Sequence, residues 1–299
     1  MIYKLKAPLK SYVWGGTKLI SDWGKTTDLP LVAESWELSF HPDGTCLVDG
    51  GVHDGKPITE VVSRADWGDN CQNFSFFPVL NKLIDAKQNL SVQVHPTDDY
   101  ALEHEGQYGK TEMWHVLDAD EGACLYIGLN RDLTPEEFAK CVSDGSICNY
   151  LNAVQVHPGE TYFIPSGTLH AIGAGITLFE VQQNSSLTYR VFDYNRVGLD
   201  GKPRQLLVEK AKKVTNLNKY VVPDAHRDGL LGRCKYFSAY RFCGERSFTY
   251  DHSFCSITVV SGNIKLNGVE LCKGETAFVT AGQPCCVTGS GQYVLTCVE

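Results

Sequence analysis

The sequence lacks the features that mark membrane, secreted and nucleic-acid-binding proteins. It has no apolar run approaching the roughly 18 residues of a membrane-spanning helix, and its start, MIYKLKAPLKSYVWGG, contains neither an apolar signal segment nor a small-residue cleavage site. It also has no run of lysine or arginine, and the net charge is −8 with an isoelectric point near 5.6. We therefore expect a cytoplasmic protein that binds neither membrane nor nucleic acid, whereas a small anionic ligand stays compatible with a few converging cations.

The twelve cysteines form no CxxC pair and are scattered along the chain. In the absence of a secretory signal, this spacing favours reduced thiols over a disulfide framework. The adjacent Cys285 and Cys286 would leave opposite faces of a strand, which suits neither a metal site nor an ordinary disulfide. We interpret the cysteines mainly as small buried apolar residues.

The 299 residues are 43% hydrophobic, enough for one large or two modest domains. Strands dominate the prediction, because many short segments are rich in β-branched and aromatic residues and end at Gly, Pro, Asn or Asp. These segments are 90–96, 124–129, 160–165, 176–183, 187–194, 237–242, 256–262 and 292–298. The sequence therefore predicts a mainly β protein.

Only three brief helices are expected. The first follows Thr134, whose cap, with Pro135 and Glu137, completes a capping box. A second is expected from Arg204, in RQLLVEKAKKV, and a third after a Thr97 cap, with acidic residues in its first turn. These helices would connect strands and lie against the β core.

Two segments of the chain echo each other. PGETYFIPSGTLHAI (158–172) and KGETAFVTAGQPCCV (273–287) share Gly-Glu-Thr, an aromatic and a β-branched residue at matching places, and a second glycine. We interpret them as two copies of one β unit, 115 residues apart. The second copy has Cys285 where the first has His170, so it retains the pattern without the candidate ligand.

Three windows in the first copy could hold a metal. Gln93 and His95, two apart in SVQVHP, would leave the same face of a strand. GKTEMWH supplies Glu112, and His170 closes the third window. Two imidazoles, a carboxylate and an amide oxygen suit a divalent ion with open positions, and zinc is the leading candidate. Taken singly, none of the four residues establishes a metal site, since a lone histidine beside a proline is more often structural than a ligand and glutamine is an uncommon zinc ligand.

The third window, G-x5-P-x-G-x2-H from Gly159 to His170, resembles the second motif of the cupin superfamily, which would place it in a jelly roll. The wider sequence resembles one family, the type I mannose-6-phosphate isomerases in their short bacterial form. The matching stretches are YVWGG (12–16), AESWELS (33–39), LSVQVHP (90–96), GKTEMW (109–114), IPSGTLHA (164–171) and QQNSSLTYRVFDYNR (182–196). They follow the family's order across about the first 200 residues.

The resemblance implies a zinc-dependent isomerase that interconverts mannose 6-phosphate and fructose 6-phosphate through a cis-enediol. It places the family's metal ligands on Gln93, His95, Glu112 and His170. The implied active-site cations and substrate contacts are Arg190, Lys110, Lys82 and Ser91. The chain departs from the long members in having KTE at 110–112 where they have KPE, Ile172 where they have Tyr, and no large helical insertion.

The base of the reaction is inferred from the residues themselves. Glu180, between Phe179 and Val181, is a candidate for a raised pKa and proton transfer, although it could instead lie on the outward face. Lys110 is the rival, or could open the sugar ring. Arg190 could contact the enediolate or the phosphate, or form a structural ion pair with Asp193. Trp14 could line the pocket.

Two other functions are compatible with a cupin. A metal-dependent dioxygenase would bind iron through mostly histidine ligands, which the glutamine disfavours. A non-catalytic cupin would bind a sugar phosphate without turnover. The predicted organisation is a catalytic jelly roll over residues 1–218 and a smaller cupin-like β domain without metal ligands over residues 219–299. The sequence does not distinguish a monomer from a homodimer.

Overall fold

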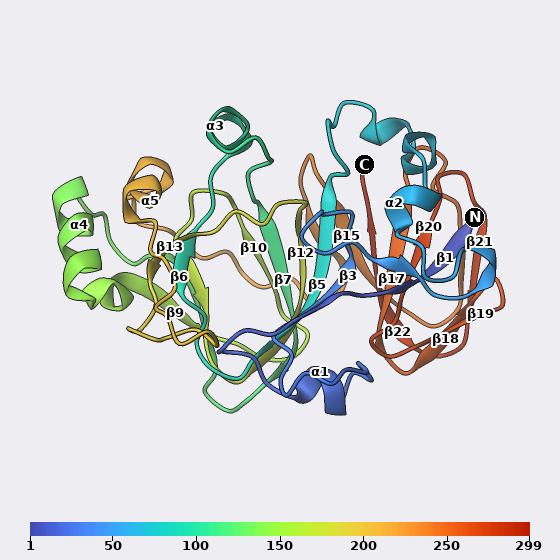
Figure 1. Ribbon diagram of the computed structural model, residues 1–299, viewed down its shortest axis with the longest axis horizontal. Helices are drawn as coiled ribbons and strands as arrows, with labels where there is room; N and C mark the ends of the chain where they lie inside the picture. The colour runs from blue at the N-terminus through green and yellow to red at the C-terminus, as the bar shows by residue number, and fades with distance from the viewer.

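Two β units lie side by side in the computed structural model, which describes residues 1–299. Strands from the middle of the sequence build one unit, and C-terminal strands build the other together with the N-terminus (Figure 1). Every ladder between named strands is antiparallel. The predicted mainly β, cupin-type jelly roll with a few short helices is confirmed.

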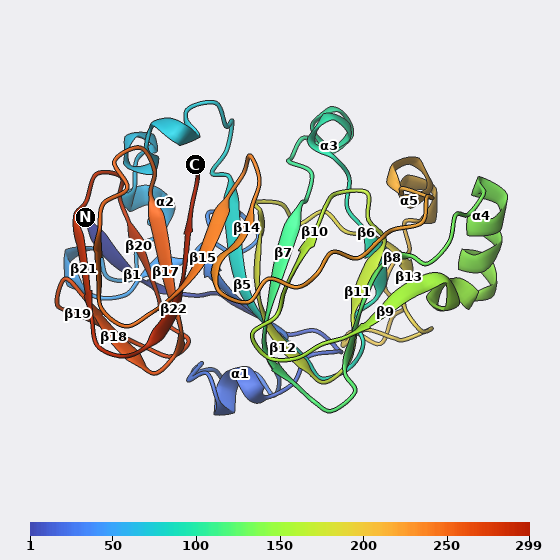
Figure 2. The same cartoon turned by 180° about the vertical axis from the view of Figure 1, so that it is seen from behind.

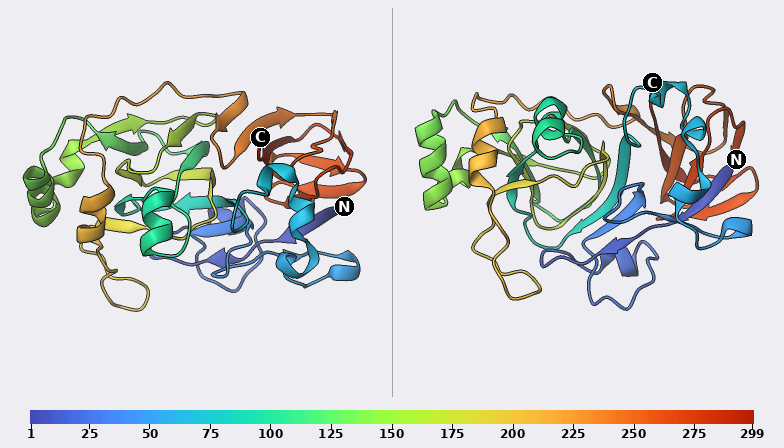
Figure 3. Two further views of the ribbon diagram at one scale, coloured as in Figure 1. Left: turned by 90° about the horizontal axis from the view of Figure 1, so that it is seen from above. Right: turned by 45° about the horizontal axis from the view of Figure 1, so that its top comes forward.

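The first unit is a barrel of two sheets, seen as a ring of strands in the right-hand view of Figure 3. In spatial order, one sheet consists of β10 (Thr161–Ile164), β7 (Glu112–Ala119), β12 (Ile176–Gln183), β5 (Val79–Ala86), β3 (Glu34–Leu38) and β2 (Leu9–Lys10). The other consists of β13 (Tyr189–Phe192), β6 (Val92–Val94), β11 (His170–Ile172), β8 (Cys124–Leu129) and β9 (Leu151–Gln155).

The second unit also has two sheets. The larger is β14 (Gly229–Arg233), β15 (Ser238–Cys243), β22 (Gln292–Cys297), β17 (Cys255–Ser261), β20 (Thr276–Val279), β1 (Ile2–Lys6) and β4 (Leu47–Val48). The smaller is β16 (Arg246–Phe248), β21 (Cys285–Thr288), β18 (Asn263–Leu266) and β19 (Val269–Cys272). Residues 215–228 run along the barrel to reach β14 (Figure 2). The boundary at residue 218 stays a prediction, and β1 and β4 pair within the C-terminal sheet.

The two similar sequence segments, 158–172 and 273–287, also have similar structures. β10 and β20 span equivalent residues at the 115-residue spacing, and β11 and β21 begin at the equivalent His170 and Cys285. The glycines of the two turns also match, since Gly167 and Gly282 both have positive φ, of 84° and 74°. The same strand, turn and strand is therefore built twice.

The helices are short and lie at the edges of the sheets. They are α1 (Lys18–Ser21), α2 (Ile58–Val61), α3 (Asp98–His104), α4 (Pro135–Asp144) and α5 (Val208–Val214), with 3₁₀ turns η1 (Gly51–His53), η2 (Arg64–Trp67), η3 (Asp69–Cys71) and η4 (Ser146–Tyr150). None has the length and apolar character needed to cross a membrane.

The helix predictions hold in part. Thr134 caps α4 with the expected capping box. α3 follows Thr97 as predicted, but the Thr97 hydroxyl makes no capping hydrogen bond. The prediction of a helix from Arg204 was wrong, because α5 begins only at Val208. The Arg204 guanidinium is instead held by Asp193, with Nε 2.8 Å from Oδ2, which fixes this segment as a loop.

The central sheet of the barrel is buried on both faces. Glu34 and Trp36 of β3 line a cavity inside the barrel. Ser35 and Glu37 alternate with them and face the C-terminal unit, where the Ser35 hydroxyl donates to the Glu37 carboxylate. Glu37 accepts from Thr276 of β20 at 3.0 Å. Because successive strand side chains alternate, one strand serves the cavity with one face and the C-terminal unit with the other. This explains why β5 and β12 are buried along their whole length.

Candidate active site

Three strands bring the predicted metal ligands together. His95 directly follows β6, Glu112 begins β7, and His170 begins β11, where its Cα pairs with that of Gln93. The backbone N–H of Gly167 donates to the His95 carbonyl at 2.8 Å, so the turn before His170 is tied to the other histidine. The positive φ of Gly167 favours a residue without a Cβ. The Pro-x-Gly pattern thus fixes the backbone turn that places His170 next to His95.

The side chains of this cluster face one another. Glu112 Oε1 lies 3.2 Å from His170 Nε2, and Glu112 Oε2 lies 3.6 Å from His95 Nε2. The Gln93 amide lies 3.3 Å from His170 Nε2, and a half-turn of that amide would direct its carbonyl oxygen there instead. All four ligand atoms predicted from the sequence therefore meet at one place.

Both imidazoles are oriented for a cation. His95 Nδ1 donates to the Leu187 carbonyl and His170 Nδ1 to the Thr168 carbonyl, each at 2.8 Å. These bonds leave the Nε2 lone pairs facing the carboxylate of Glu112, and His95 Nε2 is buried without a hydrogen-bond partner. Acceptors that face one another in a buried site are stabilised by a cation between them, so the residues fit a divalent metal ion.

The electrostatics agree with this interpretation. Burial lowers the pKa of His170 to about 4 and the pKa of His95 well below its usual value, so both rings are neutral, as metal ligands must be. Burial raises the pKa of Glu112, against the opposing effect of Lys110. A bound cation would favour the ionised form of this carboxylate.

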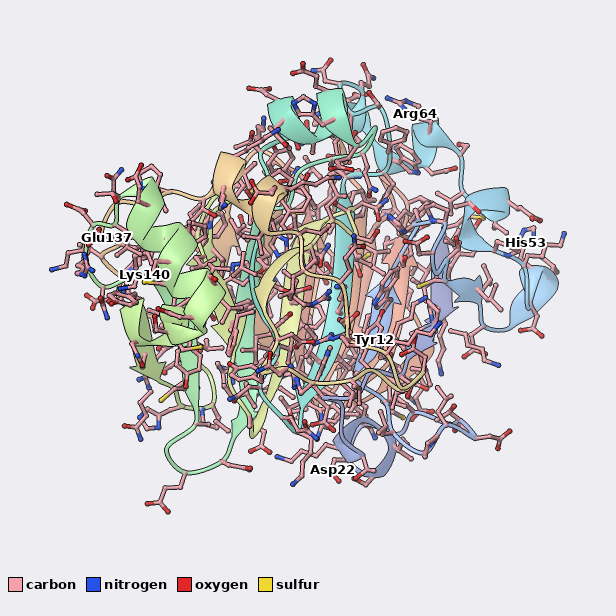
Figure 4. All side chains as sticks on the ribbon, turned by 60° about the vertical axis from the view of Figure 1, so that its left-hand side comes forward. Tyr12, Asp22, His53, Arg64, Glu137 and Lys140 are labelled. Carbon is pink, nitrogen blue, oxygen red and sulfur yellow. The ribbon has the colours of Figure 1, made fainter.

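A cavity of about 320 Å³ adjoins the cluster. Tyr12, Trp14 and Trp36 provide aromatic walls, and Trp14 is buried and stacks on Tyr12 at 5.6 Å. Figure 4 labels Tyr12, which lies beside the barrel strands. The charged side chains that line the cavity are Glu34, Lys82, Lys110, Glu180, Arg190 and Arg204. The predicted Ser91 and Gln93 also line it.

Two lysines of the cavity form ion pairs with three carboxylates. Lys82 Nζ lies 3.5 Å from Glu34 Oε2 and 3.2 Å from Glu180 Oε1. Lys110 Nζ lies 2.8 Å from Glu112 Oε2 and 3.7 Å from Glu180 Oε1. The Lys82 and Lys110 charges are thus matched by buried carboxylates, and the pKa of Lys82 is raised because Glu34 and Glu180 outweigh the effect of burial.

Glu180 faces this cluster and not the outside of the barrel. Burial alone would raise its pKa, as the sequence reasoning expected, but Lys110 and Lys82 lower it, helped by a hydrogen bond from the Trp114 indole at 2.9 Å. The expected raised pKa was therefore wrong. The sequence neighbours Phe179 and Val181 do not set the environment, because both belong to the core on the other face of β12.

Two arginines, Arg190 and Arg204, also line the cavity. Arg190 Nε donates to Ser91 Oγ at 3.1 Å and Nη1 to the Gln205 carbonyl at 3.0 Å. Asp193 pairs with Arg196 and Arg204 and not with Arg190, so the structural ion pair considered from the sequence is absent. Burial and the neighbouring Arg204 lower the pKa of Arg190, which marks a cation without a carboxylate partner.

The sequence reasoning missed two charged residues of the cavity. Glu34 comes from β3 and accepts from the Trp36 indole at 2.7 Å. Arg204 comes from the loop before α5. The AESWELS stretch contained a signal for Glu34, since alternation along a strand puts Glu34 and Trp36 on one face. Arg204 had no local signal, because the ion pair that positions it joins residues eleven apart in an irregular segment.

Comparison with known proteins connects this geometry to a family. Residues 2–124 match the model of the phosphomannose isomerase type I catalytic domain. A probable mannose-6-phosphate isomerase of Bacillus subtilis is 35% identical over 294 residues, covering 92% of this chain and 91% of that protein. A mannose-6-phosphate isomerase of Streptococcus mutans is 39% identical over 217 residues, covering 72% and 68% of the two chains.

A solved structure shows the same similarity in three dimensions. The crystal structure of a mannose 6-phosphate isomerase from Bacillus subtilis superimposes with a TM-score of 0.90 at 31% identity. The match covers 99% of each chain, so it includes both β units.

Proposed function

The chain belongs to the type I phosphomannose isomerase family and is an isomerase, and from that premise we propose that it interconverts D-mannose 6-phosphate and D-fructose 6-phosphate through a cis-enediol. The observation that carries the proposal is the cluster of His95, Glu112 and His170, which adjoins a cavity lined by lysines, arginines and carboxylates. A reaction that moves a proton between two carbons of an anionic sugar can use both features, the metal site at the reacting carbons and the cations at the phosphate.

We propose that Gln93, His95, Glu112 and His170 hold one Zn²⁺. Two neutral imidazoles and one carboxylate are a common donor set for catalytic zinc, and the amide adds a neutral oxygen. Backbone carbonyls fix both rings by their Nδ1 atoms, which keeps Nε2 free for the metal. Polarisation of the sugar carbonyl, which acidifies the neighbouring C–H, is the chemistry that the ion would supply there.

The phosphate is proposed to bind at the two arginines of the cavity. Arg190 has no carboxylate partner, and it uses only part of its five N–H donors on Ser91 and Gln205. Arg204 lines the same cavity, where Asp193 holds it in place. The lysines are already matched by carboxylates, so a dianion gains most from the arginines.

Proton transfer between the sugar carbons is proposed at the cluster of Lys82, Lys110 and Glu180. Glu180 is ionised, because Lys110 and Lys82 lower its pKa, and its carboxylate lines the cavity, so it can accept the C2 proton and return it to C1. The Lys110 ammonium contacts both Glu112 and Glu180, which places a hydrogen-bond donor beside the sugar oxygens during ring opening and enediol formation. Trp14, Tyr12 and Trp36 line the same cavity and would limit the access of water to a bound sugar.

We also propose the cytoplasm as the compartment of the enzyme. All twelve cysteines are free thiols in the structure, and six of them are not fully buried: Cys124, Cys148, Cys234, Cys243, Cys272 and Cys286. Free, accessible thiols are in keeping with a reducing environment.

The function is tested by the kinetics of mannose 6-phosphate conversion with Glu180→Gln and a matched Glu209→Gln control on the exposed face of α5. Substrate deuterated at C2 should react more slowly than unlabelled substrate, and Glu180→Gln should lose about 10²-fold or more in kcat, whereas the control should not change. Wild-type turnover by Glu180→Gln would remove Glu180 as the base. No turnover by folded, zinc-loaded wild type would favour a sugar-phosphate-binding cupin.

A further inference from the structure

A second cavity lies beside the catalytic one. Its volume is about 490 Å³, within the range of roughly 300–1,000 Å³ that small-molecule sites occupy. It is enclosed by residues 40–43, 75–77 and 105–107, together with Thr59, Trp67 and Asn184. Arg64, labelled in Figure 4, marks the η2 segment that supplies Trp67. The two cavities share no lining residue, but Asn184 lines one while Ser185 and Ser186 line the other.

Aromatic side chains form one side of this second cavity. Phe40 and Phe77 stack with their centroids 3.9 Å apart, and Trp67 meets Phe77 edge-on at 5.2 Å. Phe76 also lines the cavity and remains 47% exposed, which is unusual for so large an apolar side chain. Such a surface suits a ligand with an apolar face, as the C–H face of a sugar or polyol provides.

Unpartnered polar atoms accompany the aromatic rings. The Asn184 side-chain oxygen is buried without a hydrogen-bond partner, on a residue that is 8% exposed. The indole N–H of Trp67 is also buried without a partner. A buried polar atom without a hydrogen-bond partner destabilises the protein, and a ligand that supplies the partner removes that cost. Both atoms belong to residues that line the same cavity, and an acceptor and a donor together match hydroxyl groups, which both donate and accept.

The charges of the cavity exclude an anionic ligand. No lysine or arginine lines it, and the two carboxylates that do are already engaged. Asp43 Oδ2 accepts from Ser186 Oγ at 3.0 Å, and Glu105 Oε1 accepts from Tyr189 at 2.7 Å and from Lys210 at 2.6 Å. A phosphosugar would meet only negative charge here, and a cation would have to compete with bonds that are already made. The site therefore favours a neutral molecule.

We propose that this cavity is a second binding site, separate from the catalytic one, for an uncharged sugar or polyol. The ligand lies against Phe40, Phe76 and Phe77, accepts a hydrogen bond from Trp67 Nε1 and donates one to the Asn184 side-chain oxygen. The inference does not depend on the proposed isomerase reaction, because none of these residues lines the catalytic cavity.

The test is calorimetric titration of the full-length, zinc-loaded protein with two uncharged probes, D-mannitol and methyl α-D-mannopyranoside. Neither can be isomerised, since neither presents a free carbonyl. The titrations are carried out with and without a saturating, equilibrated mixture of mannose 6-phosphate and fructose 6-phosphate. At least one probe should bind with a dissociation constant on the order of millimolar, and the sugar phosphates should not change it.

Two variants locate the binding. Asn184→Leu and Trp67→Phe should each weaken it about tenfold, the effect of one lost hydrogen bond of about 1.4 kcal/mol. Trp23→Phe removes the same indole group outside this cavity and should bind as wild type does. Thermal denaturation checks that each variant is folded.

Three results would overturn the proposal. They are no binding of either probe by the wild type, competition between the probes and the sugar phosphates, and wild-type binding by both Asn184→Leu and Trp67→Phe. Because the isomerase assay is a separate readout, failure of this second site and failure of the proposed reaction can be told apart.

Discussion

Replacing Arg190 by methionine should separate substrate recognition from stability. The side chain keeps its apolar stem but loses the guanidinium, which now bonds Ser91 and the Gln205 carbonyl. Two of its five N–H donors are used in these bonds, so others are free for a phosphate. If two charge-assisted hydrogen bonds of about 1.5–3 kcal/mol each are lost, kcat/KM for mannose 6-phosphate should fall about 10²- to 10⁴-fold.

The same change should leave stability nearly unaltered. Burial and Arg204 lower the pKa of Arg190, so the empty site already disfavours this charge. Removing it relieves that cost and offsets the two lost hydrogen bonds. The melting temperature of Arg190→Met should therefore stay close to that of the wild type. Arg131→Met, at an exposed ion pair with Glu137, is the matched control and should change neither quantity.

The assay is steady-state isomerisation of mannose 6-phosphate, measured beside isomerisation of unphosphorylated D-mannose at high concentration. A phosphate contact predicts that only the phosphorylated substrate loses kcat/KM. An equal loss for both sugars would place Arg190 at the reacting carbons instead. A kcat/KM within about threefold of wild type for mannose 6-phosphate would refute the assignment altogether.

Three further predictions concern the surroundings of the site. Lys25→Met should destabilise the fold by about 3–5 kcal/mol in chemical denaturation, because it leaves the Glu37 carboxylate buried without its cation. In the wild type, Lys25 Nζ lies 2.6 Å from Glu37 Oε1. A loss below about 1 kcal/mol would contradict this prediction. Burial lowers the pKa of His115 from 6.5 to about 4, so neutral His115 contributes stability above pH 6.5 that is lost as the pH falls toward 4. His115→Gln should therefore remove about 3 kcal/mol of the decline between about pH 7 and pH 4, and an unchanged decline would count against it. Gly167→Ala should lower the free energy of unfolding by about 1–2 kcal/mol and also weaken zinc binding. Gly201→Ala, at a similar positive φ in open surroundings, should lower stability alone. Equal zinc affinity in both variants would refute the link between the Gly167 turn and the metal site.

The metal cluster was predictable because its signals are local. A two-residue spacing puts Gln93 and His95 on one strand face, and the Pro-x-Gly turn precedes His170 directly. Matching strand starts in the two echoed segments were predictable for the same reason, since turn glycines and strand residues recur at a fixed distance.

The environment of Glu180 could not be predicted in this way. Its sequence neighbours are apolar, but its cross-strand partners are Lys82 on one side and Trp114 on the other. Lys82 lies 98 residues and Trp114 lies 66 residues before Glu180 in the chain, and the pairing of their strands with β12 decides the direction of the pKa shift. Arg204 was missed because its ion pair with Asp193, eleven residues earlier, overrides a locally helical pattern.

The most direct test of the account is conversion of mannose 6-phosphate to fructose 6-phosphate by the purified protein after chelation and during stepwise addition of zinc. The account predicts that chelation abolishes turnover and that activity returns in proportion to zinc, up to one ion per chain. Full activity in metal-free protein, or folded protein that stays inactive with one zinc bound, would contradict it.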